Sequence, residues 1–154
     1  MSILAIELSI DYIELMELMD IRIEEITAKE TYPLRHEVMW PNKPLEYVIL
    51  KDDEEGKHWG LIVDQKLTSV ISLFIQEEEA QFRKFATKES AQGKGLGTRL
   101  LKYVIEEVKK QHISRLWCNA RIDKASFYEK FGLTKTEQTY TKGGIEYVIM
   151  ERRF

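Results

Sequence analysis

The stretch Gln92-Gly93-Lys94-Gly95-Leu96-Gly97-Thr98 decides the fold, because its three glycines separate an apolar run at 82–87 from an amphipathic run at 96–108. Glycine allows a positive φ and lets a ligand approach the backbone without a Cβ in between. If a strand enters this turn and a helix leaves it, the free N–H groups and the positive end of the helix dipole point at one place. Such a place suits an anion, so the stretch predicts a binding site for a phosphate-bearing cofactor.

Two common phosphate-binding turns do not fit. A Walker A loop needs Lys-Ser/Thr directly after its second flanking glycine, whereas Lys94 lies between glycines and Gly97 is followed by Thr98. A Rossmann turn needs G-x-G-x-x-G and an acidic residue about twenty residues further on. The glycines here follow G-x-G-x-G, and residues 117–119 hold no acid. A nucleotide-dependent transferase or oxidoreductase is therefore disfavoured.

Composition limits the remaining classes of protein. A chain of 154 residues with 44% hydrophobic and 32% charged residues predicts one soluble globular domain. A net charge of −3 without a local Lys/Arg cluster argues against a nucleic-acid partner. The single Cys118 cannot form an internal disulfide, and no signal peptide is evident, so a cytoplasmic location is expected. We expect no metal site.

The first twenty residues predict an amphipathic helix, because regularly spaced acids draw one stripe and aliphatic residues cover the remainder. The stripe consists of Glu7, Asp11, Glu14 and Glu17. These acids and the lack of an Arg/Lys-rich start argue against a membrane or targeting segment. We expect residues 1–20 to be an accessory helix that packs either on the main domain, 21–154, or on a second copy of the chain, which would give a homodimer.

Before the glycine turn the pattern predicts a strand, two short helices and a meander. Residues 21–26 alternate apolar and charged, and Thr27 with Glu30 has capping-box spacing for a following helix. Pro33 marks a break or a new helical start, and residues 34–40 form a second short helix. Extended segments are expected at 47–50, 59–63, 67–76 and 81–87, of which the last three form an antiparallel meander.

After the turn, apolar residues of 96–108 fall on one face of a helix. Residues 116–120 are short and apolar enough for a buried parallel strand. Asp123 is expected to cap a short helix that contains Tyr128 and stops at Gly132. A hairpin then joins 133–140 to 145–152.

Two segments and the order of elements resemble one family. Gln92, Gly95 and Gly97 match Q/R-x-x-G-x-G/A, and the turn therefore resembles the pyrophosphate-binding motif of the GNAT superfamily of N-acetyltransferases, which use acetyl-coenzyme A. Residues 118–121, followed by 125–133, are similar to a second segment of that family. The resemblance implies an α/β (α+β) fold of the GNAT acyl-CoA N-acyltransferase type, with a mixed, mostly antiparallel sheet and helices on both faces.

The resemblance also implies a set of coenzyme contacts. The pyrophosphate would bind N–H groups of the turn, with Lys94 and Arg99 as charge partners. The pantetheine arm would pair with the strand that precedes the turn, and the backbone of that strand would also polarise the acetyl carbonyl. Asn119 either bonds the same arm or caps a strand end. The full set is Phe85, Ala86, Thr87, Gln92, Gly93, Lys94, Gly95, Leu96, Gly97, Thr98 and Asn119.

The resemblance implies that Tyr128 is the catalytic acid. The alternative is that Tyr128 is a core residue without a catalytic role. A phenol with a reference pKa of about 10 stays protonated at neutral pH and donates as the thiolate leaves. The general base is not assigned. Cys118 is interpreted as a small buried hydrophobe and not as a nucleophile.

The acceptor side of the cleft corresponds in the family to residues 34–44. Arg35, His36 and Trp40 are therefore candidate substrate contacts, and His58, beside Trp59 at a strand start, is a further candidate. Arg35 and His36 fit a solvated helix face equally well, Trp40 fits the core, and His58 fits a surface position at a strand start.

These features together predict an N-acetyltransferase that moves an acetyl group from acetyl-CoA to a primary amine by direct attack in a ternary complex. The acceptor, a small-molecule or peptide amine, is not identified by the sequence. The alternative is a non-catalytic acyl-CoA sensor or assembly module with the same fold.

Overall fold

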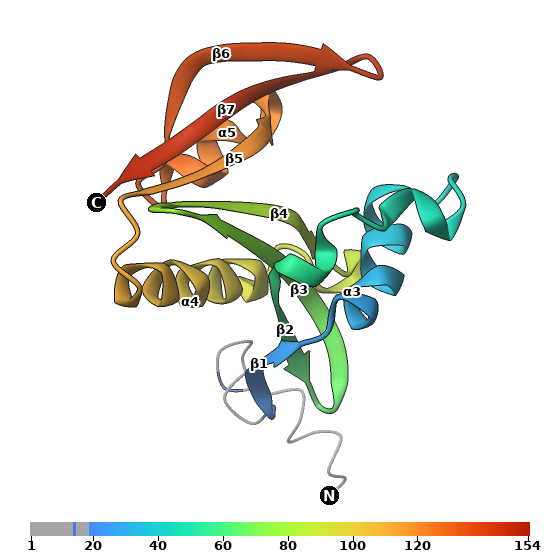
Figure 1. The fold of residues 1–154 in the computed structure, drawn as a ribbon. Helices are drawn as coiled ribbons and strands as arrows, with labels where there is room; N and C mark the ends of the chain where they lie inside the picture. Colours follow the sequence, from blue (N-terminus) through green and yellow to red (C-terminus); the bar gives the residue numbers. More distant parts are fainter. Residues whose placement is uncertain (1–13, 15–18) are drawn as a thin grey trace, which may run out of the picture.

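The structure is a computed structural model that describes residue 14 and residues 19–154 (Figure 1). Its centre is a seven-stranded sheet in the order β1-β2-β3-β4-β5-β7-β6. Neighbouring strands are antiparallel except β4 and β5, which are parallel. The strands are β1 (Ile21–Ile26), β2 (Lys57–Val63), β3 (Lys66–Gln76), β4 (Glu79–Thr87), β5 (Arg115–Arg121), β6 (Thr134–Lys142) and β7 (Ile145–Arg153).

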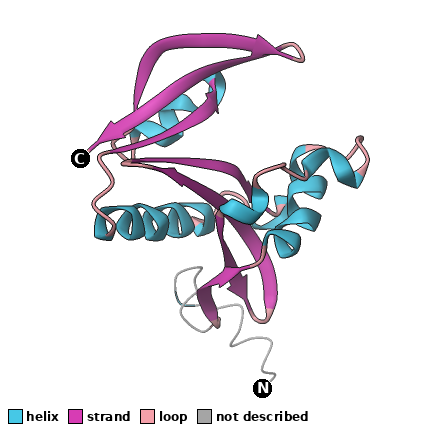
Figure 2. Cartoon of the chain, in the orientation of Figure 1, coloured by secondary structure: helices cyan, strands magenta, loops and turns pink. Residues whose placement is uncertain are grey.

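Helices cover both faces of this sheet (Figure 2). The α-helices are α3 (Ala28–Leu34), α4 (Leu96–Lys110) and α5 (Ala125–Glu129), and a π-helical turn η1 (Arg35–Met39) continues α3. Short 3-10 helices are η2 (Leu45–Val48), η3 (Asp53–Glu55), η4 (Glu89–Ala91) and η5 (Ile122–Lys124). Within the described part of the chain, no helix has the length and apolar character needed to cross a membrane.

The core forms because each long helix buries one stripe of apolar side chains. Helix α4 packs on one face of the sheet, where its buried residues join Leu61, Phe82 and Leu116 from the strands. On the other face, Leu34 of α3 packs against Val70 and Ala86. The predicted mixed, mostly antiparallel sheet with helices on both faces is confirmed.

Most of the predicted elements are also confirmed. The strand at 21–26, the meander, the helix after the glycine turn and the closing hairpin are all present. The capping box is present too, since Thr27 Oγ1 accepts from Glu30 N and the Glu30 carboxylate accepts from Thr27 N.

Three local predictions are wrong. Pro33 lies inside α3; it lacks an N–H for the i→i−4 ladder, and the helix widens directly after it into the π-helical turn η1. Residues 47–50 are not an extended segment, because η2 begins directly after Pro44. Asp123 does not cap α5, since it lies within η5 and α5 starts after Lys124 without a side-chain cap.

The accessory helix predicted for residues 1–20 lies outside the described residues, apart from Glu14, Met19 and Asp20.

Candidate active site

The three glycines of the turn are needed for two different reasons. Gly93 and Gly95 have φ angles of 76° and 79°, and a Cβ on either would meet no heavy atom within 4 Å. A Cβ on Gly97 would lie 3.1 Å from Thr87 Oγ1 and 3.2 Å from Phe85 Cζ. The first two glycines therefore set the shape of an open turn, and the third lets α4 approach β4 closely.

The turn ends in a helix N-terminus with free donors. Gly95 is the N-cap of α4 and provides no side-chain cap. Its carbonyl accepts from Arg99 N at 3.1 Å, whereas no described residue accepts from the backbone N–H of Leu96, Gly97 or Thr98. These N–H groups and the helix dipole together form a site for an anion.

Gln92 fixes the turn to the strand that precedes it. Its Nε2 donates to the carbonyl of Thr87, the last residue of β4, at 2.9 Å. The motif glutamine thus closes the loop between the end of β4 and the glycines.

Strands β4 and β5 separate after a short paired section. They are paired only at the start of each strand, from Glu79 with Arg115 to Gln81 with Trp117. Beyond this point β5 has no pairing with β4, and the two ribbons diverge (Figure 1). We refer to the place where β4 at 82–87 and β5 at 118–121 separate as the opening. The backbone of β4 at 82–87 therefore lacks a partner strand on this side, which is an arrangement that accepts an extended chain of amide groups.

A β-bulge interrupts β4 along this unpaired section. Val70 pairs with Ala86 and Ser72 with Arg83, so both Lys84 and Phe85 lie opposite Ile71. Lys84 has a φ of 55°. A bulge bends the strand and takes the extra residue out of the ladder, so it re-aims backbone donors at this position.

Tyr128 lies on α5 and packs beside the unpaired section of β4. Its ring centroid is 5.7 Å from that of Phe82 on β4 and 5.2 Å from that of Phe127. The side chain is half-buried, and burial followed by the neighbouring Cys118 raises the pKa of the Tyr128 phenol. Tyr128 is therefore a protonated donor at neutral pH.

Cys118 is buried on β5, and burial raises the pKa of its thiol to about 12. The thiolate is the nucleophilic form and is scarce at neutral pH with such a pKa. This agrees with the interpretation of Cys118 as a small buried hydrophobe.

Asn119 points away from the core that buries its neighbours Cys118 and Ala120. Its side chain is exposed and forms no hydrogen bond with a described residue. The alternative that it caps a strand end thus has no support.

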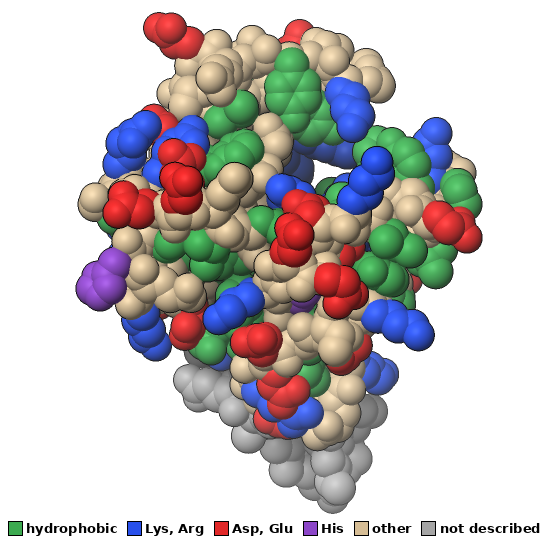
Figure 3. Space-filling view, in the orientation of Figure 1, with side chains coloured by type: hydrophobic (Ala, Val, Ile, Leu, Met, Phe, Trp, Pro, Cys, Tyr) green, Lys and Arg blue, Asp and Glu red, His purple; other side chains and the backbone are tan. Residues whose placement is uncertain are grey.

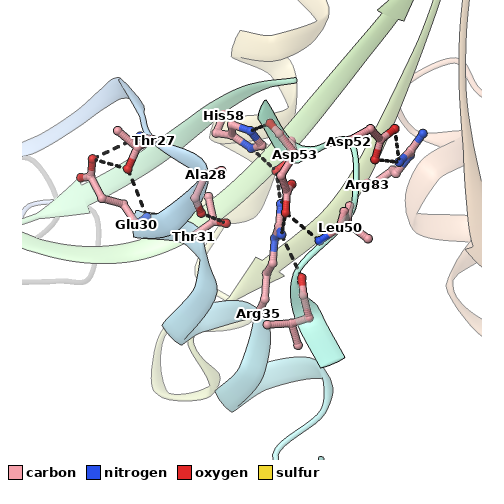
Figure 4. A network of polar contacts seen from close by, with 12 residues as sticks. Thr27, Ala28, Glu30, Thr31, Arg35, Leu50, Asp52, Asp53, His58 and Arg83 are labelled. Carbon is pink, nitrogen blue, oxygen red and sulfur yellow. Dashed lines mark hydrogen bonds and ion pairs between the residues drawn. The ribbon is translucent and has the colours of Figure 1, made fainter. Parts of the chain in front are cut away.

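Arg35 and His58 are not on the surface, which corrects their prediction as substrate contacts. Arg35 is 0% exposed, and its guanidinium bonds both carboxylate oxygens of Asp53, at 2.8 and 2.9 Å (Figure 4). His58 is 3% exposed, and its ring nitrogens contact Ser72 Oγ at 2.6 Å and the carbonyl of Asp53 at 2.8 Å. A carbonyl only accepts, so Nε2 donates to Asp53. Both side chains are enclosed in the core and bonded to internal partners, although Arg35 Nε has none, so neither presents a polar group at the surface.

His36 and Trp40 lie at the partly exposed edge of η1. His36 Nε2 is 2.6 Å from the carbonyl of Lys43, and the Trp40 ring meets the Tyr47 ring edge-on at 5.1 Å. No described contact joins either residue to Tyr128 or to the glycine turn. Their role toward an acceptor stays a prediction.

Two features of the structure were missed by the sequence analysis. The bulge at Lys84 has no local signal, since a glycine normally marks such a position. Tyr140 and Tyr147 stack at 5.1 Å with ring planes 13° apart. The hairpin around Gly143 and Gly144 makes them cross-strand partners, so counting outward from that turn would have found the pair.

Comparison with known proteins agrees with this geometry. Residues 23–154 match a family model described as an acetyltransferase (GNAT) domain. Over 140 residues the chain is 26% identical to YitI of Bacillus subtilis (strain 168), an uncharacterized N-acetyltransferase; the match covers 84% of this chain and 94% of YitI.

Solved structures share the fold. The ribosomal-protein-S18-alanine N-acetyltransferase of Escherichia coli matches with a TM-score of 0.74 at 19% identity, over 87% of this chain and 94% of that one. A GNAT family acetyltransferase of Elizabethkingia anophelis, solved with acetyl-CoA bound, matches with a TM-score of 0.70 at 19% identity, over 87% and 98%. Because the family model spans nearly all of the described residues, the chain belongs to the GNAT superfamily of N-acetyltransferases and is an acyltransferase enzyme.

Proposed function

We propose that the enzyme moves the acetyl group of acetyl-CoA to a primary amine by direct attack in a ternary complex. The observation that carries this proposal is one continuous segment, 82–98. Its first half is an unpaired, bulged strand edge, and its second half is a glycine turn that ends in free helix N–H groups. The acetyl-CoA bound to the related Elizabethkingia protein supports the choice of co-substrate.

The second half of the segment suits the pyrophosphate of the coenzyme. The N–H groups of Leu96, Gly97 and Thr98 provide donors at the positive end of the α4 dipole. Lys94 and Arg99 add positive charge beside them, and ionised groups strengthen hydrogen bonds to phosphate. The open space around Gly93 and Gly95 leaves room for the ligand.

The first half of the segment suits the pantetheine arm, which is an amide chain. The backbone of Phe85, Ala86 and Thr87 would pair with it in place of a neighbouring strand, and Asn119 would bond it from the side of β5. The re-aimed backbone at the bulge would stabilise the thioester oxygen as it becomes anionic.

The chemistry is then a single displacement. The neutral amine forms a bond to the acetyl carbon, the carbon–sulfur bond breaks, and Tyr128 gives its proton to the departing sulfur. The amine loses a proton to solvent, because no side chain is identified as the base, and the Tyr128 phenolate takes a proton back from solvent. Coenzyme A is a good leaving group, so no covalent enzyme intermediate is needed.

Calorimetric titration with acetyl-CoA tests the proposal. We expect saturable binding by the native protein that is lost in Gly95→Trp, which fills the turn. Gly144→Trp is the matched control, because Gly144 has a φ of 78°, equally empty surroundings and a place at the tip of the closing hairpin. Absence of binding by the native protein, or unchanged binding by Gly95→Trp, would refute the coenzyme site. Tight binding without thiol release for any amine would favour the sensor alternative.

A further inference from the structure

One face of the sheet beside the opening carries an uncommon set of side chains. Successive residues of a strand point to opposite faces, and Val148 of β7 is buried in the core on the α4 side. Tyr147 therefore points to the opposite face, together with its cross-strand partners Tyr140 on β6 and Arg121 on β5. Lys142 lies two residues after Tyr140 and shares this face. Strand β6 thus brings a cation and half of the stacked tyrosine pair to the face from which Asn119 also projects.

Lys84 adds a second cation from β4. It occupies the extra position of the bulge with a φ of 55°, in the left-handed region where such a bulge normally has glycine. Its side chain is half-buried and forms no hydrogen bond or ion pair with a described residue. A strained backbone at an active site points to a functional reason for the residue that bears it.

The positive charge around Lys84 is not compensated. Of the nearby acids, Asp53 is paired with Arg35 at 2.8 Å and Asp52 with Arg83 at 3.0 Å. Burial lowers the pKa of Lys84, and the charges of Arg35, Lys142 and Arg83 lower it further, against which only Asp53 acts. The chain as a whole has a net charge of −3, so this is a local excess.

Lys and Arg side chains border a hollow below the β6–β7 hairpin (Figure 3). In Figure 1, which has the same orientation, β4 lies below this place and the β6–β7 hairpin above it.

We propose that this face binds an anionic group of the acceptor, so that the acceptor is an amine which also carries a carboxylate or a phosphate. Lys84 and Lys142 hold the anion, and the stacked pair of Tyr140 and Tyr147 forms a flat wall beside it. An anion bound here would give the half-buried ammonium group of Lys84 an ionised partner. Hydrogen bonds between ionised groups are stronger than those between neutral groups. The inference rests on the proposed acetyl transfer and adds the class of substrate.

The test compares acceptors that differ only in the anion. One arm uses tyrosine and tyrosinamide, and the other uses phosphoethanolamine and ethanolamine; thiol release gives kcat/KM for each. We expect the anionic member of at least one pair to exceed its neutral counterpart by about tenfold or more, and the better pair identifies carboxylate or phosphate. Lys84→Met and Lys142→Met should reduce that ratio toward one, and Lys142→Met should do so without changing the KM for acetyl-CoA.

A charge-reversal variant and a control variant complete the test. Lys142→Glu, at an exposed strand end where folding is not at risk, should invert the preference toward neutral acceptors. Lys66→Met is the matched control, since Lys66 is also exposed at a strand end but lies in the β2–β3 hairpin. Equal use of neutral and anionic amines, or a preference unchanged in both lysine variants, would overturn the inference and leave the transferase intact. No thiol release with any amine would overturn the proposed transfer itself.

Discussion

Replacing Arg35 with Met should destabilise the fold by about 3–5 kcal/mol, because it breaks a buried ion pair on one side only. Arg35 forms four hydrogen bonds, two to Asp53 and one each to the carbonyl of Val48 and to Ser72 Oγ. Without the guanidinium, the Asp53 carboxylate, which is 2% exposed, keeps only the N–H of Leu50 at 2.8 Å. Met retains much of the length of the stem, so the loss reports the uncompensated charge more than a cavity.

The same pair has a defined pH dependence. Burial by itself would raise the pKa of Asp53, but the hydrogen bonds from Arg35 and Leu50 N–H, with the charges of Arg35 and His58, outweigh it and the pKa is lowered. A lowered pKa contributes stability that is present above the unfolded value, about 4, and is lost as pH falls through the folded value. The stability of the native protein should therefore decline below about pH 4, and Asp53→Asn should lack this component.

Denaturant unfolding followed by circular dichroism measures the free energy of unfolding of each variant. Arg153→Met is the matched control, because the Arg153 side chain is 69% exposed and its ion pair with Glu151 should contribute less than about 1 kcal/mol. A double variant, Arg35→Met with Asp53→Leu, should recover part of the loss, since it leaves no unpaired charge. If Arg35→Met stays within about 1 kcal/mol of the native protein at an unchanged m-value, the assignment of Arg35 to the core network is wrong.

Two further predictions concern the site. Tyr128→Phe should lower kcat by a factor of about 10²–10⁴ with unchanged acetyl-CoA affinity. Because the pKa of Tyr128 is raised, the kcat of the native enzyme should not fall through ionisation of this acid up to about pH 10, where an ordinary tyrosine ionises. Steady-state kinetics across this range decide the point, and full turnover by the variant would exclude the acid role. Gly97→Val should weaken acetyl-CoA binding and lower the melting temperature, because its Cβ would press on Thr87 Oγ1 at 3.1 Å and on Phe85. Calorimetry and thermal unfolding measure the two effects, and native values for both would contradict the close approach of α4 to β4.

The sequence predicts the parts of this protein that depend on neighbours along the chain. The glycine turn, the capping box at Thr27 and the closing hairpin each rest on a few adjacent residues with definite conformational needs. Arg35 and His58 illustrate the opposite case. Both looked exposed because a charged helix position and a strand start are usually solvated, but the sheet is covered on both faces and buries them together. A strand that is buried on both faces has no regular alternation of apolar and polar residues. The sequence therefore does not show which of its side chains are buried.

The bulge at Lys84 lies beyond local prediction for a related reason, since it depends on the offset between two strands. Between Val70 and Ser72 the pairing of β3 with β4 shifts by one residue. The hydrophobic pattern specifies register strongly where one face of a strand is buried and the other is solvated, whereas residues 68–74 of β3 are all buried.

The Arg35 network fixes the register of β3 where the hydrophobic pattern does not. Ser72 is the residue of β3 at which pairing resumes beyond the bulge, and its Oγ is held by Arg35 Nη2 at 2.9 Å and by His58 Nδ1 at 2.6 Å. A slip of β3 by one residue would remove Ser72 from both partners and leave buried polar groups unpaired, which costs about 1–3 kcal/mol for each group. The network therefore opposes the slip that would erase the bulge. Arg35, expected from the sequence to touch the acceptor, thus holds β3 in the register that leaves the bulge in β4.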